Sequence, residues 1–411
     1  MAKLSSSNGK KANVPKLRFP EFTEEWKASN IGEISTYIKG APLSKSDISE
    51  TGTPFILYGE LYTTYKEVAT EIKRKTNCIV DKKYFSKIGD VVIPTSGETP
   101  EEIATATCVM TPNVILAGDL NIFRINDIDG RFFSYVINHK VNKDISRIAQ
   151  GKSIVHIKGE EISKIQIKYP SAEEQQKILS FIELLSLKIE KQERLIEKLK
   201  KYKRGALSAL FPKKGEITPQ YRFAGFTKPW EQRKLGNVVQ VERGGSPRPI
   251  DDYITDSQNG LNWVKIGDAP AQGHYITKTA EKIKPEGLSK TREVHPGDLI
   301  LSNSMSFGKP YIMGIDGCIH DGWLLIRDIN NTFDLTFLCH LLGTPQMLDQ
   351  YRSLASGSTV NNLNKELVGN TVVTIPKIDE QRVLGQYLER LDNLITLHQR
   401  ELTYFFRRIL C

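Results

Sequence analysis

A ten-residue segment occurs twice in this chain of 411 residues, and the duplication constrains the fold more than any other feature of the sequence. Leu17–Trp26 returns as Tyr221–Trp230 at an offset of 204 residues, with its Arg, two Phe, Thr and Trp unchanged. A repeat at this spacing predicts two copies of one domain. The length agrees, because 411 residues are enough for two or more domains that each bury a core.

The ends of the two copies correspond, whereas their middles, about 40–145 and 245–350, do not. We interpret this pattern as one scaffold that carries two different recognition surfaces. Simple duplication followed by drift is the alternative, but it would blur ends and middles alike. The closing motifs match at an offset of 206: Gly151-Lys-Ser-Ile with Gly357-Ser-Thr-Val, and Pro170, Glu174 and Gln175 with Pro376, Glu380 and Gln381.

Each middle alternates short β-rich runs with Gly, Pro and Asn breaks, which is typical of strands in a mixed domain. The predicted strands are Val91–Ile93, Ile122–Ile125, Lys164–Ile167, Asp298–Leu301 and Val372–Ile375, and the predicted short helices are Phe132–Asn138 and Leu335–Leu342. The predicted fold class is α+β: two pseudo-symmetric mixed α/β domains separated by two long antiparallel coiled-coil helices.

A long amphipathic helix is predicted at the end of each copy. Pro170 and Pro376 disfavour helix before them, Ser171 and Asp379 are candidate caps, and helical periodicity follows. The first helix is predicted over residues 172–204. The apolar residues predicted to pack against the partner helix are Ile178, Leu185, Ile189, Leu199, Leu384, Leu391, Ile395 and Leu402.

Gln192 and His398 occupy equivalent core positions of these two helices. Two interpretations stay open. A polar layer would fix the register of the pair at some cost in stability, or the helix ends would fray outward.

The formal charge of +9 is unevenly distributed. Residues 1–16 carry four Lys and no acid, and residues 171–214 carry 11 basic against 6 acidic residues. Residues 17–170 carry 20 of each sign, and residues 215–411 carry 22 of each. Nucleic-acid recognition by the two copies would therefore depend on the placement of basic residues more than on bulk charge.

Signatures of catalysis and metal binding are weak. Gly151-Lys152-Ser153 lacks the earlier Gly of a P-loop, and Glu71-Ile72-Lys73 lacks the partner strand of a metal-dependent nuclease. Five scattered Cys and seven His without paired spacing argue against a disulfide framework and a metal site. The sequence offers no signal peptide and no apolar run long enough for a membrane helix, so a cytoplasmic location is expected.

The duplicated Arg-Phe-x-x-Phe-Thr-x-x-Trp openings, the variable middles and the Pro-x-x-x-Glu-Gln helices resemble the specificity subunit of Type I restriction–modification systems. The exit of the first helix, Lys203-Arg-Gly-Ala-Leu-Ser-Ala-Leu-Phe211, is similar to that family too. The second helix departs from the family by ending Tyr404-Phe-Phe-Arg-Arg-Ile-Leu-Cys411. The boundaries expected from the resemblance are a basic flexible tail (1–14), target-recognition domain 1 (15–169), a spacer helix (170–212), target-recognition domain 2 (213–375) and a second spacer helix (376–411).

The resemblance implies a chain that makes no bonds itself. Each recognition domain would read one half of a split double-stranded DNA target, while the helices set the spacer and dock methyltransferase subunits. Two modification subunits would methylate adenine with S-adenosylmethionine, and two restriction subunits would translocate and cleave DNA with ATP and Mg. No cofactor is expected on this chain.

Candidate DNA contacts are polar side chains on loops of the variable middles, because paired donors and acceptors read base edges. They are Lys39, Lys45, Tyr58, Thr95, Ser96, Arg147, Gln150, Lys152 and Ser153 in the first copy, and Arg243, Ser246, Arg248, Lys265, Asn303, Ser304, Ser358, Thr359 and Asn361 in the second. The turns at Gly151–Ser153 and Gly357–Thr359 suit phosphate contact. Trp26 and Trp230, in the repeated openings, are expected to pack rather than stack on bases.

The basic run at the end of the first helix, Lys198, Lys200, Lys201, Lys203 and Arg204, has two interpretations. It would contact DNA phosphate or a partner subunit, or it would be a solvated helix end that complements the helix dipole. For the whole chain, the main alternative to a DNA-reading subunit is a two-domain coiled-coil protein-interaction scaffold. A stand-alone nuclease or methyltransferase is disfavoured by the missing motifs.

Overall fold

The structure is a computed structural model that describes residues 15, 17–151, 154–303, 308–355 and 362–410, with side chains described as far as Phe405. The chain divides into two compact units, and the boundary between Leu187 and Lys188 falls inside one long helix. Each unit is described by itself. In the described part of the chain, no helix has both the length and the apolar character that a membrane crossing requires.

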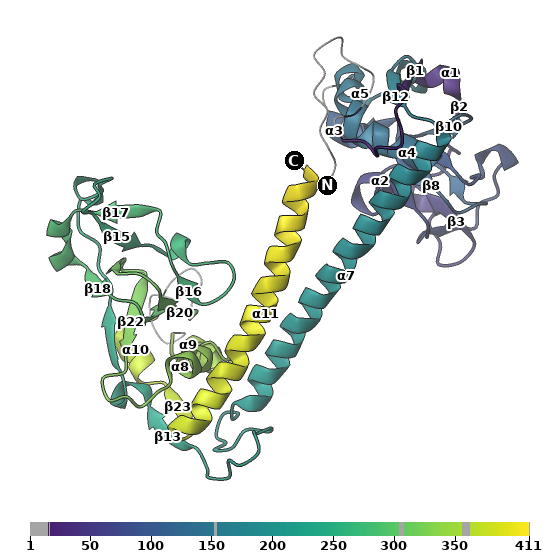
Figure 1. Cartoon of the computed structure of the whole chain (residues 1–411). Coiled ribbons are helices and arrows are strands. Elements are labelled where there is room, and N and C mark those ends of the chain that lie inside the picture. The colour runs from purple at the N-terminus through teal and green to yellow at the C-terminus, as the bar shows by residue number, and fades with distance from the viewer. Residues whose placement is uncertain (1–14, 16, 152–153, 304–307, 356–361, 411) are drawn as a thin grey trace. The chain divides into compact units, whose positions relative to one another are not determined.

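Each unit is built on the same five-stranded sheet (Figure 1). The strand orders are β2-β10-β6-β8-β4 and β14-β22-β19-β20-β16, antiparallel throughout except for the last pair, which is parallel in both units. The strands of unit 1 are β2 (Ser35–Lys39), β4 (Val68–Ala69), β6 (Asp90–Pro94), β8 (Thr107–Val109) and β10 (Leu120–Ile125). Those of unit 2 are β14 (Gln240–Arg243), β16 (Tyr275–Ile276), β19 (Leu299–Ser302), β20 (Pro310–Met313) and β22 (Trp323–Arg327).

Smaller sheets repeat as well. A second sheet has the order β5-β3-β9 in unit 1 and β17-β15-β21-β18 in unit 2. Its strands are β3 (Thr53–Ile56), β5 (Lys75–Thr76), β9 (Ile115–Leu116), β15 (Leu261–Val264), β17 (Glu281–Ile283), β18 (Arg292–Val294) and β21 (Gly317–Ile319). The divergent middles therefore keep one topology, since a strand requires a β-compatible apolar pattern rather than particular residues.

The ends of each copy are joined by a two-stranded sheet. β1 (Lys27–Asn30) pairs with β12 (Gln166–Tyr169), and β13 (Glu231–Lys234) pairs with β23 (Val372–Ile375). Each opening segment is thus hydrogen-bonded to the strand that precedes the long helix.

The predicted elements are largely confirmed. Helix α8 (Leu335–Leu342) has its predicted bounds, and α4 (Gly130–Val136) begins two residues before the predicted 132–138 helix. The long helices are α7 (Ala172–Leu210) and α11 (Ile378–Leu410). Helix α7 is longer than the predicted 172–204 because its exit stays helical and packs Leu210 and then Phe211 into the core of unit 2.

The two candidate helix caps differ. The Ser171 hydroxyl accepts from the Glu174 amide at 3.4 Å, at the N-terminus of α7. Asp379 was the wrong choice for α11, because the helix already begins at Ile378 and Asp379 lies inside its first turn, paired with Arg382.

An Arg–Trp–Glu clamp fastens the opening of unit 1 to α7. The Arg18 guanidinium makes a bidentate pair with the Glu174 carboxylate, with both N···O distances 2.7 Å. Trp26 Nε1 donates to the same carboxylate at 3.3 Å, and the Glu174 side chain is 1% exposed. A carboxylate this buried is stable only when its oxygens are paired and hydrogen-bonded.

The same clamp recurs in unit 2. Arg222 pairs with Glu380 on α11 through two N···O contacts of 2.6 Å, and Trp230 Nε1 donates to Glu380 at 3.3 Å. Trp26 and Trp230 also make edge-to-face ring contacts with Phe132 and Phe337 of their units. The prediction that these Trp pack is therefore confirmed.

The matched Gln beside each clamp Glu has one role in both units. Gln175 Oε1 accepts from the Asp129 amide and its Nε2 donates to the Pro170 carbonyl, at 2.9 and 3.0 Å. Gln381 does the same with the Asp334 amide and the Pro376 carbonyl, at 3.0 Å each. Each long helix is thereby bonded to the start of the short helix in its domain.

Gly40 and Gly244 follow the edge strand of each central sheet, where two backbones approach closely. Their amides donate to the carbonyls of Leu120 and Trp323, both at 2.9 Å. A Cβ on Gly40 would lie 2.8 Å from a backbone oxygen, and one on Gly244 would lie 2.2 Å from the His320 carbonyl oxygen. No side chain fits at these positions without backbone movement.

Within unit 2, residues 188–210 of α7 run antiparallel to α11 (Figure 1). The Lys188 ammonium lies over the Phe405 ring, and at the other end the Tyr202 and Tyr387 hydroxyls are 2.8 Å apart. Between these layers, Gln192 Nε2 lies 2.9 Å from His398 Nδ1 and donates to the His398 carbonyl at 3.1 Å. Of the two open interpretations, the polar layer is present, and pairing extends at least to Phe405 despite the divergent C-terminal sequence.

One residue predicted to pack against the partner helix lies elsewhere. Ile178 packs against the core of unit 1, because the first turns of α7 rest on that domain. Leu384 and Leu391 of α11 pack in the core of unit 2, to which Ala206, Leu207 and Leu210 of α7 also contribute. The other predicted packing residues, all half-buried or buried, are Leu185, Ile189, Leu199, Ile395 and Leu402.

Replacing the clamp carboxylate of unit 2 by Glu380→Gln is expected to lower the free energy of unfolding by about 2–4 kcal/mol, because Arg222 loses its charged partner at a buried site. The matched control is Glu231→Gln, whose ion pairs with Arg233 and Lys377 are exposed; it should change stability by less than about 0.5 kcal/mol. Urea unfolding of the full chain measures both. Equal effects of the two variants would contradict a clamp role for Glu380.

Gly244→Ala is expected to destabilise unit 2 by about 2–3 kcal/mol, because the added methyl group collides with the His320 carbonyl. Gly267→Ala is the control, since its Cβ would meet nothing within 4 Å. Thermal unfolding of the two variants checks the difference. Wild-type stability of Gly244→Ala would show that the close approach is absent in solution.

Candidate nucleic-acid interface

The candidate interface is the end of the central sheet in each domain, here called the strand-end surface. Lys39 and Arg243 are the last residues of edge strands β2 and β14, and each pairs in register with the second residue of the neighbouring strand, Asn121 or Leu324. The two basic residues thus hold equivalent positions although the surrounding sequences differ. Both are exposed.

Thr95 and Asn303 are the next equivalent pair. The Thr95 amide donates to the Asp119 carbonyl at 2.7 Å, and the Asn303 amide donates to the Gly322 carbonyl at 2.9 Å. Each residue follows a central strand, β6 or β19, and faces the loop that enters β10 or β22. The fold therefore brings sequence-predicted residues from distant segments to one edge.

In unit 1 the strand-end surface borders a hollow of about 1070 Å³. The predicted residues Lys39, Lys45, Tyr58 and Thr95 all line it. Its walls also carry acidic groups, among them Asp119 and Glu60, and Glu60 is paired with Arg74 at 2.7 Å. Lys39 and Lys45 are exposed cations of this lining, which also contains the paired Arg74.

Ser96 and Gln150 lie beside this hollow rather than in it. β7 (Ser96–Gly97) pairs with β11 (Val155–His156), and Gln150 exchanges backbone hydrogen bonds with His156 at 3.0 and 2.8 Å. The Ser96 side chain is buried and donates to Asp119 at 2.7 Å. Gln150 is exposed and available to contact a ligand, whereas the Ser96 hydroxyl is already hydrogen-bonded to Asp119 in the loop before β10.

In unit 2 four predicted residues converge on Asp321. Ser246 Oγ donates to its carboxylate at 3.0 Å, and a guanidinium nitrogen of Arg248 lies 4.0 Å from it. Arg243 Nε and Asn303 Nδ2 donate to its carbonyl at 3.4 and 2.8 Å. Asn303 is 3% exposed, and its side-chain amide supports the Asp321 loop.

Asp321 also binds His320, whose Nε2 lies 2.9 Å from the carboxylate. The carboxylate therefore partly neutralises the basic groups of this surface, and in unit 1 the Asp119 carboxylate accepts from Ser96 in the corresponding loop. Bound DNA would have to outcompete these internal acids, which disfavours nonspecific attachment.

Two predicted residues lie in other local settings. Lys265 is half-buried and paired with Glu281, and exposed Arg147 pairs with Asp144 on its own helix, α5 (Asn142–Ile148), at 3.0 Å. Six of the predicted contacts lie outside the described residues: Lys152, Ser153, Ser304, Ser358, Thr359 and Asn361.

Residues that follow the two predicted Gly turns in the sequence, Ile157 and Leu363, are hydrogen-bonded at equivalent points of the strand-end surface. The Ile157 amide donates to the Thr95 carbonyl at 2.9 Å, and the Leu363 amide donates to the Asn303 carbonyl at 3.1 Å. Gly151 has a φ of +139°, a value that favours glycine. The turn itself is described only at Gly151 in the first copy, and residues 357–359 lie outside the described part of the chain.

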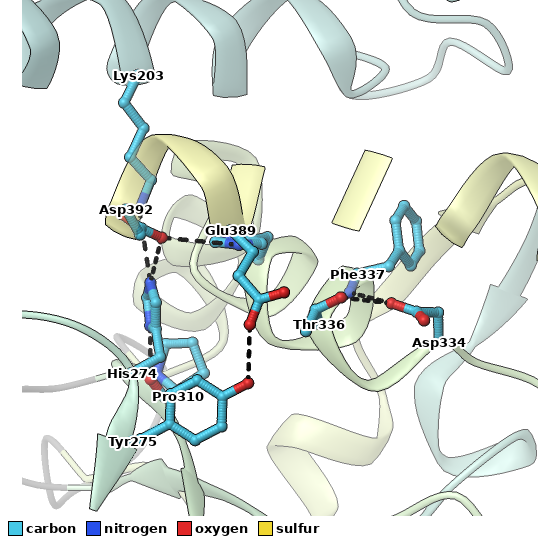
Figure 2. A network of polar contacts seen from close by, with 10 residues as sticks. Lys203, His274, Tyr275, Pro310, Asp334, Thr336, Phe337, Glu389 and Asp392 are labelled. Atoms are coloured by element: carbon cyan, nitrogen blue, oxygen red, sulfur yellow. Dashed lines mark hydrogen bonds and ion pairs between the residues drawn. The ribbon is translucent and has the colours of Figure 1, made fainter. Parts of the chain in front are cut away.

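The basic run at the end of α7 separates into two groups. Lys203 points into unit 2, where its ammonium contacts the Asp392 carboxylate of α11 at 2.5 Å (Figure 2). Lys198, Lys201 and Arg204 are exposed, and Lys200 pairs with Glu197 on the same helix. Lys203 is thus a structural residue, and the others remain a solvated basic face.

Asp392 binds His274 as well, with Oδ2 3.1 Å from Nε2 (Figure 2). Burial opposes ionisation of both groups, but their mutual hydrogen bond prevails: the pKa of Asp392 falls to about 2 and that of His274 rises to about 10. His340 lies beside them, and burial lowers its pKa to about 3. Within the described residues, His274, His340 and Asp392 are the group whose side chains could hold a metal ion.

Several residues that organise the candidate site and the clamp were missed from the sequence. Asp321 and His320 give no local signal, because their partners come from three other segments. The clamp residues did have a sequence signal. Arg18, Trp26 and Glu174 each match a residue of the second copy, and that match alone could have identified them as structural partners.

Comparison with known proteins agrees with this geometry. The family model described as Type I restriction modification DNA specificity domain matches residues 23–201 and 227–403. The MjaVIII specificity subunit of a Type I restriction enzyme from Methanocaldococcus jannaschii is 24% identical, over 95% of this chain and 92% of that protein. The putative MjaX specificity subunit of the same organism is 23% identical, over 95% and 92%.

Solved structures share the fold. The S subunit of a Type I restriction–modification system from M. genitalium matches 96% of each chain with a TM-score of 0.57 and 16% identity. A chain from a study of complex assembly and conformational transition of the type I R-M system matches 93% of this chain and 95% of its own length, with a TM-score of 0.56 and 18% identity. With two matched specificity domains, this chain belongs to the DNA specificity subunits of Type I restriction–modification systems.

Proposed function

We propose that each recognition domain reads one half of a bipartite DNA target through its strand-end surface. The chain itself is noncatalytic in this proposal. It directs adenine methylation by two methyltransferase subunits, or DNA cleavage by two translocase–nuclease subunits. S-adenosylmethionine, ATP and Mg are bound by those partner subunits. The paired helices set the distance between half-sites and dock the methyltransferases.

One observation carries the proposal: equivalent backbone positions present different side chains in the two domains. Lys39 corresponds to Arg243 and Thr95 to Asn303 by strand register and hydrogen bonding. A scaffold that keeps its backbone geometry but carries different side chains at the sheet edge is suited to reading two different half-sites. Base edges are distinguished by such donor and acceptor changes.

The charge distribution favours sequence-specific recognition of DNA over nonspecific binding along it. Each domain is balanced in sequence, and Asp119 and Asp321 lie among the polar groups of the two surfaces. Affinity then requires matched base contacts in addition to phosphate contacts. The alternative, a protein-interaction scaffold without DNA reading, gives no reason for exposed basic residues at equivalent strand ends.

Arg243→Ala, in complex with the methyltransferase subunits, is expected to weaken binding to the specific duplex about 10-fold or more and to relax discrimination at a base of one half-site only. The reason is that Arg243 is an exposed cation whose main internal contact is a 3.4 Å bond to a carbonyl. Binding to duplexes substituted base by base measures the effect.

The matched control is Arg233→Ala, an exposed arginine on β13 that is paired with Glu231. It should leave affinity and base preference unchanged. If Arg243→Ala leaves every base preference intact, the strand-end surface of unit 2 does not read DNA. If the intact complex prefers no sequence at all, the scaffold alternative holds.

Inserting one heptad into both helices is expected to lengthen the target spacer by about three base pairs, because seven helical residues add about 10.5 Å and base pairs rise about 3.4 Å. The insertion sites lie between Gln192 and Tyr202 in α7 and between Asp392 and His398 in α11, so the flanking contact layers keep their partners. Methylation mapping reads the spacer.

Both half-sites should remain unchanged in this variant. An insertion in α7 alone is the control, since it shifts Gln192 away from His398 and should impair the complex. An unchanged spacer in the double insertion would refute the role of the helices as a ruler.

A further inference from the structure

We propose that His274, His340 and Asp392 form a binding site for Zn²⁺ in unit 2. His274 directly precedes strand β16, His340 lies on helix α8, and Asp392 lies on helix α11. The proposal is independent of DNA reading. Imidazole nitrogen and carboxylate oxygen are ligands that zinc accepts.

The spacing of the ligand atoms fits a zinc ion. Asp392 Oδ2 lies 3.1 Å from His274 Nε2 and 3.7 Å from His340 Nε2, and one ligand atom from each residue lies within 4.8 Å of the other two. Bonds of about 2.0–2.1 Å in a tetrahedral site place ligand atoms about 3.3 Å apart. Only small side-chain movements would bring the three atoms to that separation.

A hydrogen bond at Nδ1 fixes the orientation of the His274 ring. His274 Nδ1 lies 3.4 Å from the Pro310 carbonyl oxygen, an acceptor, so Nδ1 carries a proton and Nε2 faces Asp392 (Figure 2). Metal-binding histidines commonly donate their other N–H to a carbonyl in this way. A small cavity of about 40 Å³ borders His274, His340 and Asp392 and leaves room for a water as fourth ligand.

His340 supports the site because it is buried beside Asp392. Its side chain is 4% exposed, and its Nε2 lies 3.7 Å from Asp392, beyond hydrogen-bond distance.

Lys203 is the competitor for this position. Its ammonium contacts Asp392 at 2.5 Å and lies 3.5 Å from His274 Nε2, so it occupies the space next to the two ligand atoms (Figure 2). Zinc would have to displace this ammonium group. The site therefore predicts opposite effects for two kinds of substitution, which a structural ion-pair network would not produce.

The test is titration of the chelator-treated full chain with Zn²⁺ by calorimetry and with Co²⁺ by visible absorption. We expect one saturable equivalent, with Asp392→Asn and His274→Ala each weakening binding more than about 100-fold. Lys203→Met should tighten binding about 10-fold or more, because a positive charge is removed from the site. His295→Ala, which alters an exposed His–Asp pair of the same unit, should bind as the wild type does.

Circular dichroism identifies variants that fail to fold. If the ligand variants fail to fold, zinc binding by Lys203→Met still tests the proposal. The absence of a saturable equivalent would overturn the proposal. Unchanged or weaker zinc binding by Lys203→Met would overturn it as well, and so would loss of binding in His295→Ala.

Discussion

The buried carboxylate at the start of each long helix is the interaction on which the rest of the structure depends. Glu174 and Glu380 each bind a bidentate arginine and an indole N–H from an opening segment about 150 residues earlier in the chain. A charge with 1% or 3% side-chain exposure tolerates no other arrangement. The clamp therefore fixes where each helix leaves its domain.

The adjacent glutamines extend this constraint into the sheet domain. Gln175 and Gln381 bond the start of a short helix and the turn before the long one, so helix, clamp and core form one unit in each copy. The edge of the central sheet is free to vary because it takes no part in that framework. This separation explains how one fold carries Lys39 in one domain and Arg243 in the other.

Much of the framework could be predicted from the sequence, because the matched ends of the repeats are the clamp and helix residues themselves. The register of Gln192 with His398 was visible for the same reason, since long helices follow a simple period. The shared topology of the middles was not visible, because strands β2 to β10 and β14 to β22 share little beyond apolar character and an Asp–Arg pair, Asp90 with Arg124 and Asp298 with Arg327. Surfaces such as the Asp321 cluster could not be predicted, since Arg243, Asn303 and Asp321 meet only after three loops fold together. The burial of Ser96 and Asn303 could not be predicted either, because both are polar residue types that usually lie at the surface.

The central claim is that two copies of one scaffold read two different half-sites held at a fixed distance. Methylation-sensitive sequencing of DNA from a host that expresses this chain with its methyltransferase subunit tests the claim most directly. The account predicts one bipartite motif, with two unlike halves, a spacer of constant length and one modified adenine in each half. A continuous motif, two identical halves or methylation without sequence preference would contradict it.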